Sequence, residues 1–244
     1  MTLPASPEHF SYTADGVVYT ASRFHRDAAR GRVLLMPDWE GMNSGWAQEI
    51  GRLYSQTCDA EVIVTDHYGQ HRPHPGFDEA AYINQQLYRD TERSRSIFRG
   101  MVAALQAHWQ ASGPLVVVGF CSGGAFSFET GRSGAAVDAV FCVHGDPRTI
   151  DPIDQPGDYP VFTVVHGEID PFVPQSSLDA FAEEMRAHRI RWNLHIISDA
   201  KHSFTRFDNR RSGYGIAYSK RAEIETRHLV AAQILSLIEA NATR

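Results

Sequence analysis

Five short apolar segments recur along this chain of 244 residues, and segments with helical periodicity lie between most of them. Each is too short for a helix and rich in Val, Leu, Ile or Phe, which is typical of strands buried on both faces of a sheet. They are residues 33–36, 61–64, 116–118, 137–143 and 161–165. Strands that alternate with helices favour a mainly parallel sheet with helices on both faces. The sequence therefore predicts an α/β fold.

The remaining segments extend the same pattern without dividing it. Residues 10–24 alternate around Asp15-Gly16, which predicts a β-hairpin with a two-residue turn. Further predicted elements are a strand at 192–197 and helical segments at 46–56, within 77–110, at 125–130, at 178–187 and at 217–240. No linker, repeat or low-complexity segment interrupts the chain. We predict one domain over residues 1–244, with residues 1–30 as an N-terminal hairpin extension of it.

Charge and cysteine content restrict the partners and the compartment. The formal net charge is −6 and no basic face is evident, so nucleic acid is not expected as a partner. No apolar stretch approaches membrane-spanning length, and the first residues lack the pattern of a secretory signal. Cys58, Cys121 and Cys142 are odd in number and form no C-x-x-C motif, which fits a reducing, cytoplasmic compartment. We expect a small-molecule partner and no membrane; the oligomeric state stays open, with a monomer preferred.

One glycine-rich segment predicts a nucleophile. It reads Gly119-Phe120-Cys121-Ser122-Gly123-Gly124 and follows an apolar run directly. This is the G-x-Nu-x-G pattern of a nucleophile elbow, in which a strand turns sharply into a helix. Glycines on both sides permit close packing around a strained turn, and the amides of the following helix favour negative charge near the thiol. Cys121 is the predicted nucleophile.

Two later residues complete a predicted triad. Asp170 follows the strand at 161–165, and His202 follows the strand at 192–197. The carboxyl ends of parallel strands gather at one edge of a sheet, and nucleophile, acid, histidine is the order of the α/β-hydrolases. His202 would take the thiol proton, and Asp170 would orient His202 and stabilise its cationic form. The Ser122 amide is the predicted first oxyanion donor and the Trp39 amide the second.

These motifs together resemble one known family. Gly119-Phe120-Cys121-Ser122-Gly123-Gly124, Gly167-Glu168-Ile169-Asp170-Pro171-Phe172-Val173-Pro174 and His202-Ser203-Phe204-Thr205-Arg206 look like the dienelactone hydrolase family. Asp38-Trp39-Glu40-Gly41-Met42-Asn43 resembles the acidic-x-x-Gly-x-Asn loop of the same family. The resemblance implies an α/β-hydrolase fold and hydrolysis of a small ester or lactone through an acyl-cysteine intermediate. It also implies that neither a metal nor an organic cofactor takes part.

The resemblance assigns roles to two charged residues. Asp38 stands where the family usually carries Glu, which contacts the nucleophile and participates in its activation. Aspartate is shorter by one methylene, so Glu40 remains an alternative for this contact. Arg206 matches a family arginine that binds the substrate carboxylate. The second family arginine has no clear match among Glu79, Ala80, Ala81 and Tyr82, so the hydrolase chemistry carries over more strongly than the dienelactone substrate.

Several alternative functions remain compatible with the sequence. A thioesterase or acyltransferase would use the same triad, and a noncatalytic ligand-binding or thiol-sensing protein would use the same fold. A redox sensor would prefer a resolving cysteine, and neither Cys58 nor Cys142 forms a motif with Cys121. The spacing of His67, His71 and His74 is not that of a zinc site, so we interpret them as part of a loop beside the pocket. His144 lies near the same sheet edge without an assigned role.

Overall fold

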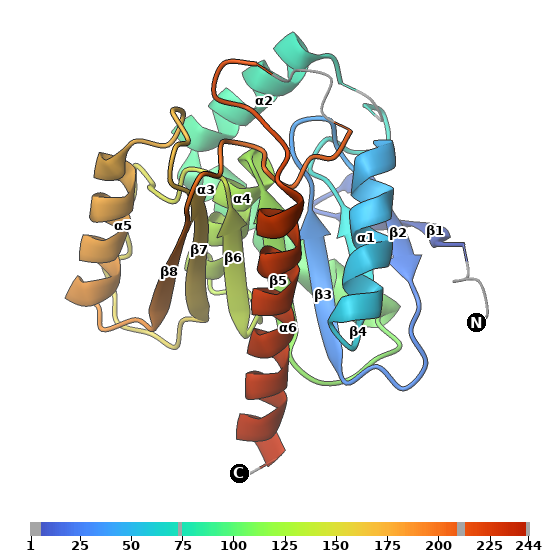
Figure 1. Ribbon diagram of the computed structural model, residues 1–244. Helices are drawn as coiled ribbons and strands as arrows, with labels where there is room; N and C mark the ends of the chain where they lie inside the picture. Colours follow the sequence, from blue (N-terminus) through green and yellow to red (C-terminus); the bar gives the residue numbers. More distant parts are fainter. Residues whose placement is uncertain (1–5, 73–74, 209–212, 243–244) are drawn as a thin grey trace.

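The computed structural model describes residues 6–72, 75–208 and 213–242 of the chain. Within these ranges, eight strands form one sheet in the order β1-β2-β4-β3-β5-β6-β7-β8 (Figure 1). The strands are β1 (Glu8–Ala14), β2 (Val17–Phe24), β3 (Gly31–Met36), β4 (Ala60–Thr65), β5 (Leu115–Phe120), β6 (Ala139–Val143), β7 (Val161–Gly167) and β8 (Trp192–Ile197). From β4 to β8 all neighbours are parallel, and only the β1–β2 and β2–β4 pairs are antiparallel. The predicted mainly parallel sheet is therefore confirmed.

Helices cover both faces of this sheet, as the alternating pattern predicts. The helices are α1 (Gly45–Thr57), α2 (Phe77–Arg89), α3 (Thr91–Leu105), α4 (Ser122–Arg132), α5 (Gln175–Ala187) and α6 (Lys220–Ala242). One core contains Phe98 of α3, Phe126 of α4 and Phe181 of α5. The core on the other face contains Trp46 of α1 and Ile234 of α6. The helix α2 crosses the upper end of the sheet in Figure 1, and its Leu87 joins the first of these cores.

The segment 77–110, which the sequence predicts to be mostly helical, forms two helices with a break between them. Asp90 separates α2 from α3, with a non-helical backbone at φ −126° and ψ 77°. Its Oδ1 accepts a hydrogen bond of 3.0 Å from the backbone N of Arg93, so Asp90 caps the start of α3. Aspartate favours this position because its side chain satisfies an amide that has no partner inside the helix. The break allows α2 to leave the face of the sheet.

The predicted hairpin is confirmed at the N-terminal edge of the sheet. Ala14 pairs with Val17 across the turn, and Asp15 and Gly16 both have positive φ, 49° and 75°. A turn with two positive φ values matches the twist of the flanking strands, and Asp-Gly adopts it readily. Because β2 pairs with β4, the hairpin extends the same sheet.

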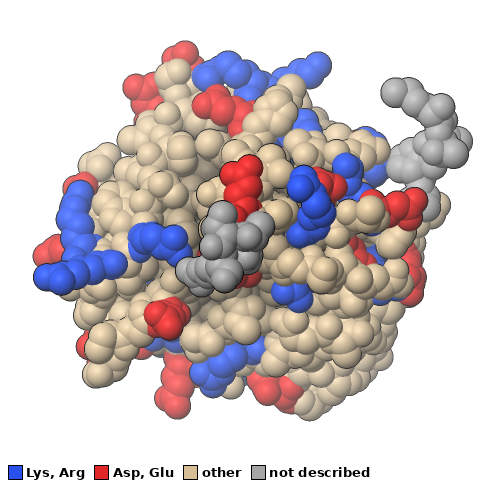
Figure 2. Space-filling view, turned by 90° about the horizontal axis from the view of Figure 1, so that it is seen from below, with Lys and Arg blue, Asp and Glu red and all other residues tan. Residues whose placement is uncertain are grey.

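The described surface carries charges of both signs. Figure 2 views the molecule from the end at which α6 finishes, and there basic and acidic side chains are interspersed. That face lacks the continuous basic stripe that would follow a phosphate backbone. Within the described ranges, no helix combines the length and the apolar character that crossing a bilayer requires.

Candidate active site

The turn between β5 and α4 places Cys121 at a strained apex. Its backbone has φ 53° and ψ −117°, a conformation that non-glycine residues rarely adopt and that is often found at functional sites. Gly123 must lack a side chain, because a Cβ there would clash with the backbone oxygens of Met36 and Pro37. The glycine therefore lets the loop after β3 pack directly against the elbow.

Three side chains that are far apart in the sequence form one hydrogen-bonded chain. Sγ of Cys121 lies 3.3 Å from Nε2 of His202, and Nδ1 of His202 lies 2.8 Å from Oδ2 of Asp170. The other carboxylate oxygen of Asp170 accepts a hydrogen bond of 2.8 Å from the backbone N of Phe172. The backbone N of His202 donates to the carbonyl of Gly215 over 2.9 Å. The carboxylate of Asp170 is thus held by a backbone amide as well as by His202, and the backbone of His202 is anchored to Gly215.

The surroundings of His202 favour its protonated form. Burial alone would lower the pKa of His202, but the negative charge of Cys121 and the hydrogen bond to Asp170 outweigh it and raise the pKa to about 10. At neutral pH an imidazolium therefore faces the sulfur. The thiolate is the form of a cysteine that attacks carbonyl carbon, and cysteines next to a cationic histidine are the ones typically used in this way.

A cavity of about 660 Å³ opens over Cys121 and His202. Its wall includes Trp39 from the loop after β3, Phe172 beside Asp170, and one face of α2. Aromatic rings dominate the mouth: Phe172 packs on the ring of His202 with centroids 5.1 Å apart, and Trp39 meets Phe77 edge-on at 5.2 Å. A mostly apolar concavity with a few converging polar groups is typical of a small-molecule site.

The sequence reasoning missed the contribution of α2 to this cavity. The lining residues of the helix are Phe77, Ala81, Asn84, Gln85 and Tyr88. Their spacing of three and four residues places them on one helical face, so the sequence contains a signal for a shared face. It contains no signal that this face covers Cys121, because the helix reaches the site through the break at Asp90.

Both residues predicted as oxyanion donors line the same cavity as Cys121. Ser122 is the first residue of α4, and both Ser122 and Trp39 line the cavity with Cys121. The carbonyl of Trp39 accepts a hydrogen bond of 3.1 Å from the Tyr68 hydroxyl, which ties this loop to the segment after β4. The amides at the start of a helix attract negative charge.

Asp38 and Arg206 are paired with each other. Nη1 of Arg206 donates to Asp38 over 2.6 Å, Nη2 donates to Glu40 over 2.9 Å, and Nε donates to Asp208 over 3.0 Å. Burial raises the pKa of Asp38, although the charge of Arg206 acts against this. The guanidinium also lies over the ring of Trp46, 4.8 Å from its centroid. Among the described residues that line the cavity there is neither Asp38 nor Arg206.

His144, which has no role in the sequence analysis, packs against the triad histidine. It is buried, its ring centroid lies 5.4 Å from that of His202, and its Nε2 is 2.9 Å from Oγ1 of Thr205. Burial and the charge of His202 lower its pKa well below the usual value, so the ring is neutral. His144 therefore supports the ring of His202 without adding charge.

The described histidines of the histidine-rich loop, His67 and His71, do not belong to the chain of contacts from Cys121 to Asp170. His67 is held by a contact of 2.7 Å between its Nε2 and Oδ1 of Asn84, and burial lowers its pKa to about 4. His71 is exposed, and His74 lies outside the described residues. In the described part of the chain, no cluster of three or more His, Cys, Asp or Glu side chains is arranged to hold a metal ion.

The other two cysteines have no access to this chemistry. Cys58 and Cys142 are buried and unpaired. Burial raises the pKa of Cys58 to about 12 and raises that of Cys142 as well, so both remain thiols. Cys121 is the partly exposed cysteine of the described chain.

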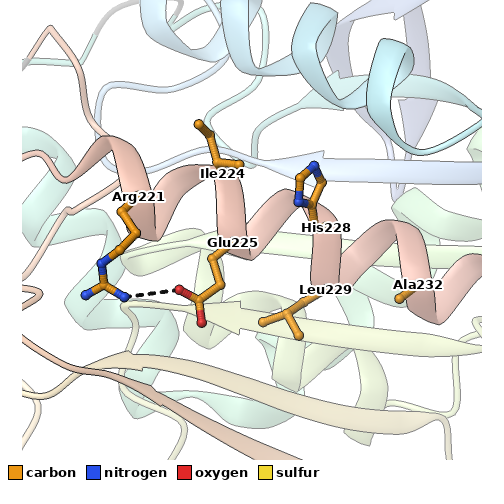
Figure 3. Close-up of a pocket in the computed structure, with 6 residues that line it drawn as sticks. All are labelled: Arg221, Ile224, Glu225, His228, Leu229 and Ala232. Atoms are coloured by element: carbon orange, nitrogen blue, oxygen red, sulfur yellow. Dashed lines mark hydrogen bonds and ion pairs between the residues drawn. The ribbon is translucent and has the colours of Figure 1, made fainter.

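A separate groove of about 520 Å³ runs along α6 (Figure 3). It is lined by Ile224, Leu229 and Ala232 together with an ion pair of 3.3 Å between Arg221 and Glu225. The six residues that line it include no Cys, Ser, Thr or Lys, and none of them is Cys121, Asp170 or His202. The cavity over Cys121 is therefore the candidate active site.

Comparisons with known proteins identify the family of the chain. Residues 20–233 match the sequence model of the Dienelactone hydrolase family. The chain is 30% identical over 186 residues to Carboxymethylenebutenolidase 2 of Cupriavidus pinatubonensis, which covers 72% of this chain and 75% of that protein. Residues Cys121, Asp170 and His202 all lie within the matched range.

The fold is similar to those of solved α/β-hydrolase structures. A dienelactone hydrolase-like promiscuous phosphotriesterase from metagenomic libraries superimposes with a TM-score of 0.82 at 23% identity, covering 96% of this chain and 99% of that one. An α/β hydrolase enzyme from a Medee basin deep-sea metagenome library gives a TM-score of 0.63 at 14% identity, with 96% and 99% covered. These likenesses confirm the α/β-hydrolase fold that the sequence predicts.

Proposed function

The chain belongs to the dienelactone hydrolase family of hydrolases, and from this premise we propose that it cleaves a small ester or lactone through an acyl-cysteine intermediate. The observation that carries the proposal is the contact chain from Cys121 through His202 to Asp170, with distances of 3.3 and 2.8 Å, at the base of a largely apolar cavity. The curated relative is named as a carboxymethylenebutenolidase, a name that denotes a lactone substrate and favours this bond type.

In the acylation step, Sγ of Cys121 attacks the carbonyl carbon and the carbonyl electrons move to oxygen. The amides of Ser122 and Trp39 hold the resulting oxyanion. Collapse of this intermediate breaks the bond to the leaving oxygen, which takes the proton from Nε2 of His202. The products of the step are an alcohol and a thioester on Cys121; from a lactone, the alcohol stays attached to the acyl group.

In the deacylation step, His202 changes from acid to base. The charge on Cys121 is a main cause of its raised pKa. Acylation removes that charge, so the pKa of His202 falls and the neutral imidazole can accept a proton from water. Hydroxide then attacks the thioester, and the thiolate leaves with the acid released. Asp170 holds the ring in one orientation through both steps.

We propose a positioning role for the pair of Asp38 and Arg206. Asp38 and Arg206 are bound to each other, and neither is among the described residues that line the cavity over Cys121. The same holds for the alternative Glu40, which is also bound to Arg206. Three carboxylates around one guanidinium instead support a fixed loop between Asp38 and Gly41, and with it the position of the Trp39 amide.

The proposed setting follows from the rest of the chain. All eight strands of the described residues belong to one sheet, which supports a single hydrolase domain. The three cysteines are unpaired, which supports a reducing compartment and hence the cytoplasm. The proposed chemistry needs water and side chains only.

The test is mass spectrometry of the intact protein, quenched early after mixing with activated esters and lactones, some bearing a carboxylate. We expect a transient acyl adduct on Cys121 that is absent in Cys121→Ala and accumulates in His202→Ala. Circular dichroism of each variant verifies that it is folded. If only a thiol or amine acceptor removes the adduct, the protein is an acyltransferase. If it turns over acyl thioesters efficiently but not esters or lactones, it is a thioesterase. Neither adduct nor turnover from a folded protein would favour a ligand-binding or thiol-sensing role.

A further inference from the structure

A second groove adjoins the active-site cavity. It has a volume of about 560 Å³ and shares Tyr88 and Asp146 with the cavity over Cys121. Its floor includes Ala125, which lies one turn after Ser122 on α4. The two spaces therefore adjoin at Tyr88 and Asp146, near the start of α4.

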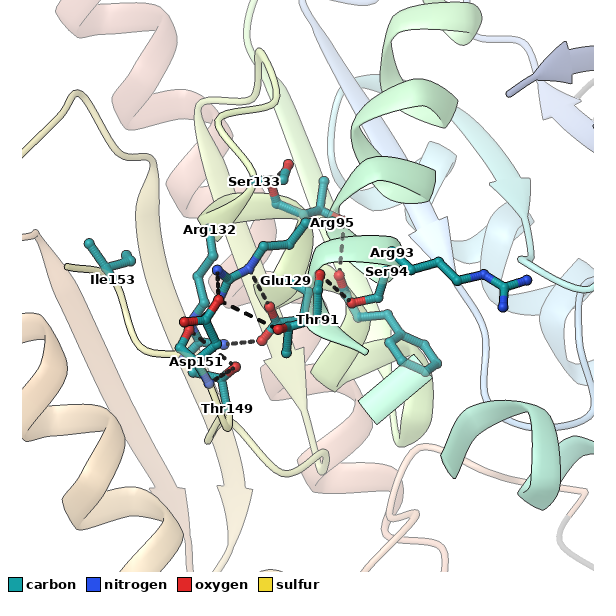
Figure 4. Close-up of polar contacts among 12 residues, drawn as sticks. Thr91, Arg93, Ser94, Arg95, Glu129, Arg132, Ser133, Thr149, Asp151 and Ile153 are labelled. Carbon is teal, nitrogen blue, oxygen red and sulfur yellow. Dashed lines mark hydrogen bonds and ion pairs between the residues drawn. The ribbon is translucent and has the colours of Figure 1, made fainter. Parts of the chain in front are cut away.

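The ionisable groups of this groove are already paired within the protein. Glu129 accepts hydrogen bonds of 2.8 Å from Arg95 and 2.9 Å from Arg132, and Figure 4 shows both arginines converging on it. Asp146 and Arg148 form an ion pair of 2.9 Å. Since each charge has its partner, an anionic or cationic ligand would have to compete with an existing ion pair.

The hydroxyl groups of the two threonines in the groove, Thr91 and Thr149, face the protein as well. Oγ1 of Thr149 accepts a hydrogen bond of 3.2 Å from the backbone N of Asp151, and Thr91 lies 3.5 Å from the Asp151 carboxylate. Asp151 in turn accepts from Arg95 over 2.7 Å, so the loop after β6 is anchored to α3 (Figure 4). What remains for a ligand is the apolar surface of Leu87, Tyr88, Ala125 and Ile150.

Large apolar side chains stand in water where the two spaces open. Ile150 is 70% exposed on the groove, and Phe77 and Phe172 are about half exposed on the cavity. Tyr88, on the boundary, is stacked on the buried ring of Phe126 with centroids 5.0 Å apart, so the wall is fixed. Exposed apolar side chains that gather around a concave site mark a surface that a ligand covers.

We propose that the substrate is an uncharged ester with an extended apolar arm that passes Tyr88 into the groove beside Ile150. The inference rests on the proposed function, since the ester bond must lie at Cys121. The arm is an alkyl chain or a ring system, because the groove offers apolar contacts and no unpaired charge among its described residues.

The experiment is a chain-length series measured below the concentration at which the esters form micelles. One arm uses p-nitrophenyl esters from acetate to decanoate, and the other uses acetates of alcohols from methanol to octanol. We expect kcat/KM to rise about twofold or more per methylene in one of the series, since burial of a methylene favours binding by up to about fourfold.

Two variants test whether the rise in kcat/KM with chain length depends on the groove. In Ile150→Asp, the ratio of kcat/KM for the eight-carbon ester to that for the shortest ester should fall at least tenfold. Ile150→Leu should preserve the ratio. The matched control is Leu235→Asp, because Leu235 is also an exposed apolar residue, 40% exposed, but lies on α6 outside both cavities. It should leave the ratio within twofold of the wild type.

The outcomes separate the two proposals. Acyl adducts on Cys121 with no gain along either series, or a gain that Ile150→Asp leaves intact, would overturn the extended arm and leave the hydrolase proposal standing. No adduct and no turnover with any ester would overturn both. A gain that falls in Ile150→Asp and survives in Leu235→Asp establishes the arm.

Discussion

The carboxylate of Asp38 accepts a hydrogen bond of 2.6 Å from Nη1 of Arg206, 168 residues further along the chain. Both side chains are buried, and the remaining nitrogens of the guanidinium are held by Glu40 and Asp208. The pair joins the loop after β3, which contributes Trp39 to the cavity, to the segment that follows His202. The pair thus fixes the position of the Trp39 loop relative to the segment that contains His202.

Arg206→Ala should destabilise the fold strongly. Removal of the guanidinium leaves the buried carboxylate of Asp38 without its partner, and breaking a buried ion pair in this way costs about 3–5 kcal/mol. Guanidinium chloride denaturation measures the free energy of unfolding. Arg221→Ala is the control, because its ion pair with Glu225 is exposed and contributes less than about 1 kcal/mol. Equal, small losses in both variants would contradict a buried, structural pair.

Alkylation should discriminate among the three cysteines. Iodoacetamide at pH 7 is expected to modify Cys121 in the native protein, since it is partly exposed and faces the imidazolium of His202. Cys58 and Cys142 should react more than ~100-fold more slowly, because burial raises their pKa values and excludes the reagent. Peptide mapping over time reads out each site. Rapid modification of Cys142 before unfolding would refute its burial.

His202 should titrate near pH 10 in the folded protein. Its pKa is raised from an ordinary value of about 6.5, so its protonation stabilises the fold fully below pH 6.5, and this contribution is lost as the pH rises towards 10. NMR of the ring resonances follows the titration. Asp170→Asn should lower the midpoint by about one unit or more and reduce kcat/KM by ~10²–10⁴-fold. His67, whose pKa is lowered to about 4, is the internal control. An unchanged midpoint in Asp170→Asn would exclude the orienting role of the carboxylate.

Gly123→Ala should impair both stability and activity. A methyl group at this position meets the backbone oxygens of Met36 and Pro37, which cannot rotate away, so we expect a loss of about 1–3 kcal/mol. The displaced loop carries Trp39, so kcat/KM should fall as well. Gly45→Ala is the matched control, because a Cβ there has no neighbour within 4 Å, and alanine is the better helix former. Thermal unfolding and ester hydrolysis are measured in parallel for both variants. Equal effects of Gly123→Ala and Gly45→Ala would contradict the close contact of Gly123 with the loop after β3.

Much of the fold and the order of the site residues follow from local signals in the sequence. Continuous apolar runs predict the central strands, and Asp15-Gly16 predicts the hairpin turn, because backbone preferences act over a few residues. Cys121, Asp170 and His202 were predicted at the ends of strands, and a parallel sheet brings such ends to one edge. In the structure, His202 lies between the other two, with Nε2 3.3 Å from Sγ of Cys121 and Nδ1 2.8 Å from Oδ2 of Asp170.

Tertiary structure alone decided which charges meet and what covers the nucleophile. The family resemblance suggests Asp38, or alternatively Glu40, as the contact of the thiol and Arg206 as the contact of the substrate carboxylate. The ion pair that Asp38 and Arg206 form with each other has no signal in the sequence. Their pairing depends on the distance and burial of groups 168 residues apart, and no local pattern encodes these quantities. The cavity wall from α2 and the groove beside Ile150 have the same origin, because they form only when separate segments pack around the elbow. Short-range preferences thus determine the framework and the candidate catalytic residues, and long-range packing determines the shape and charge of the space in which they act.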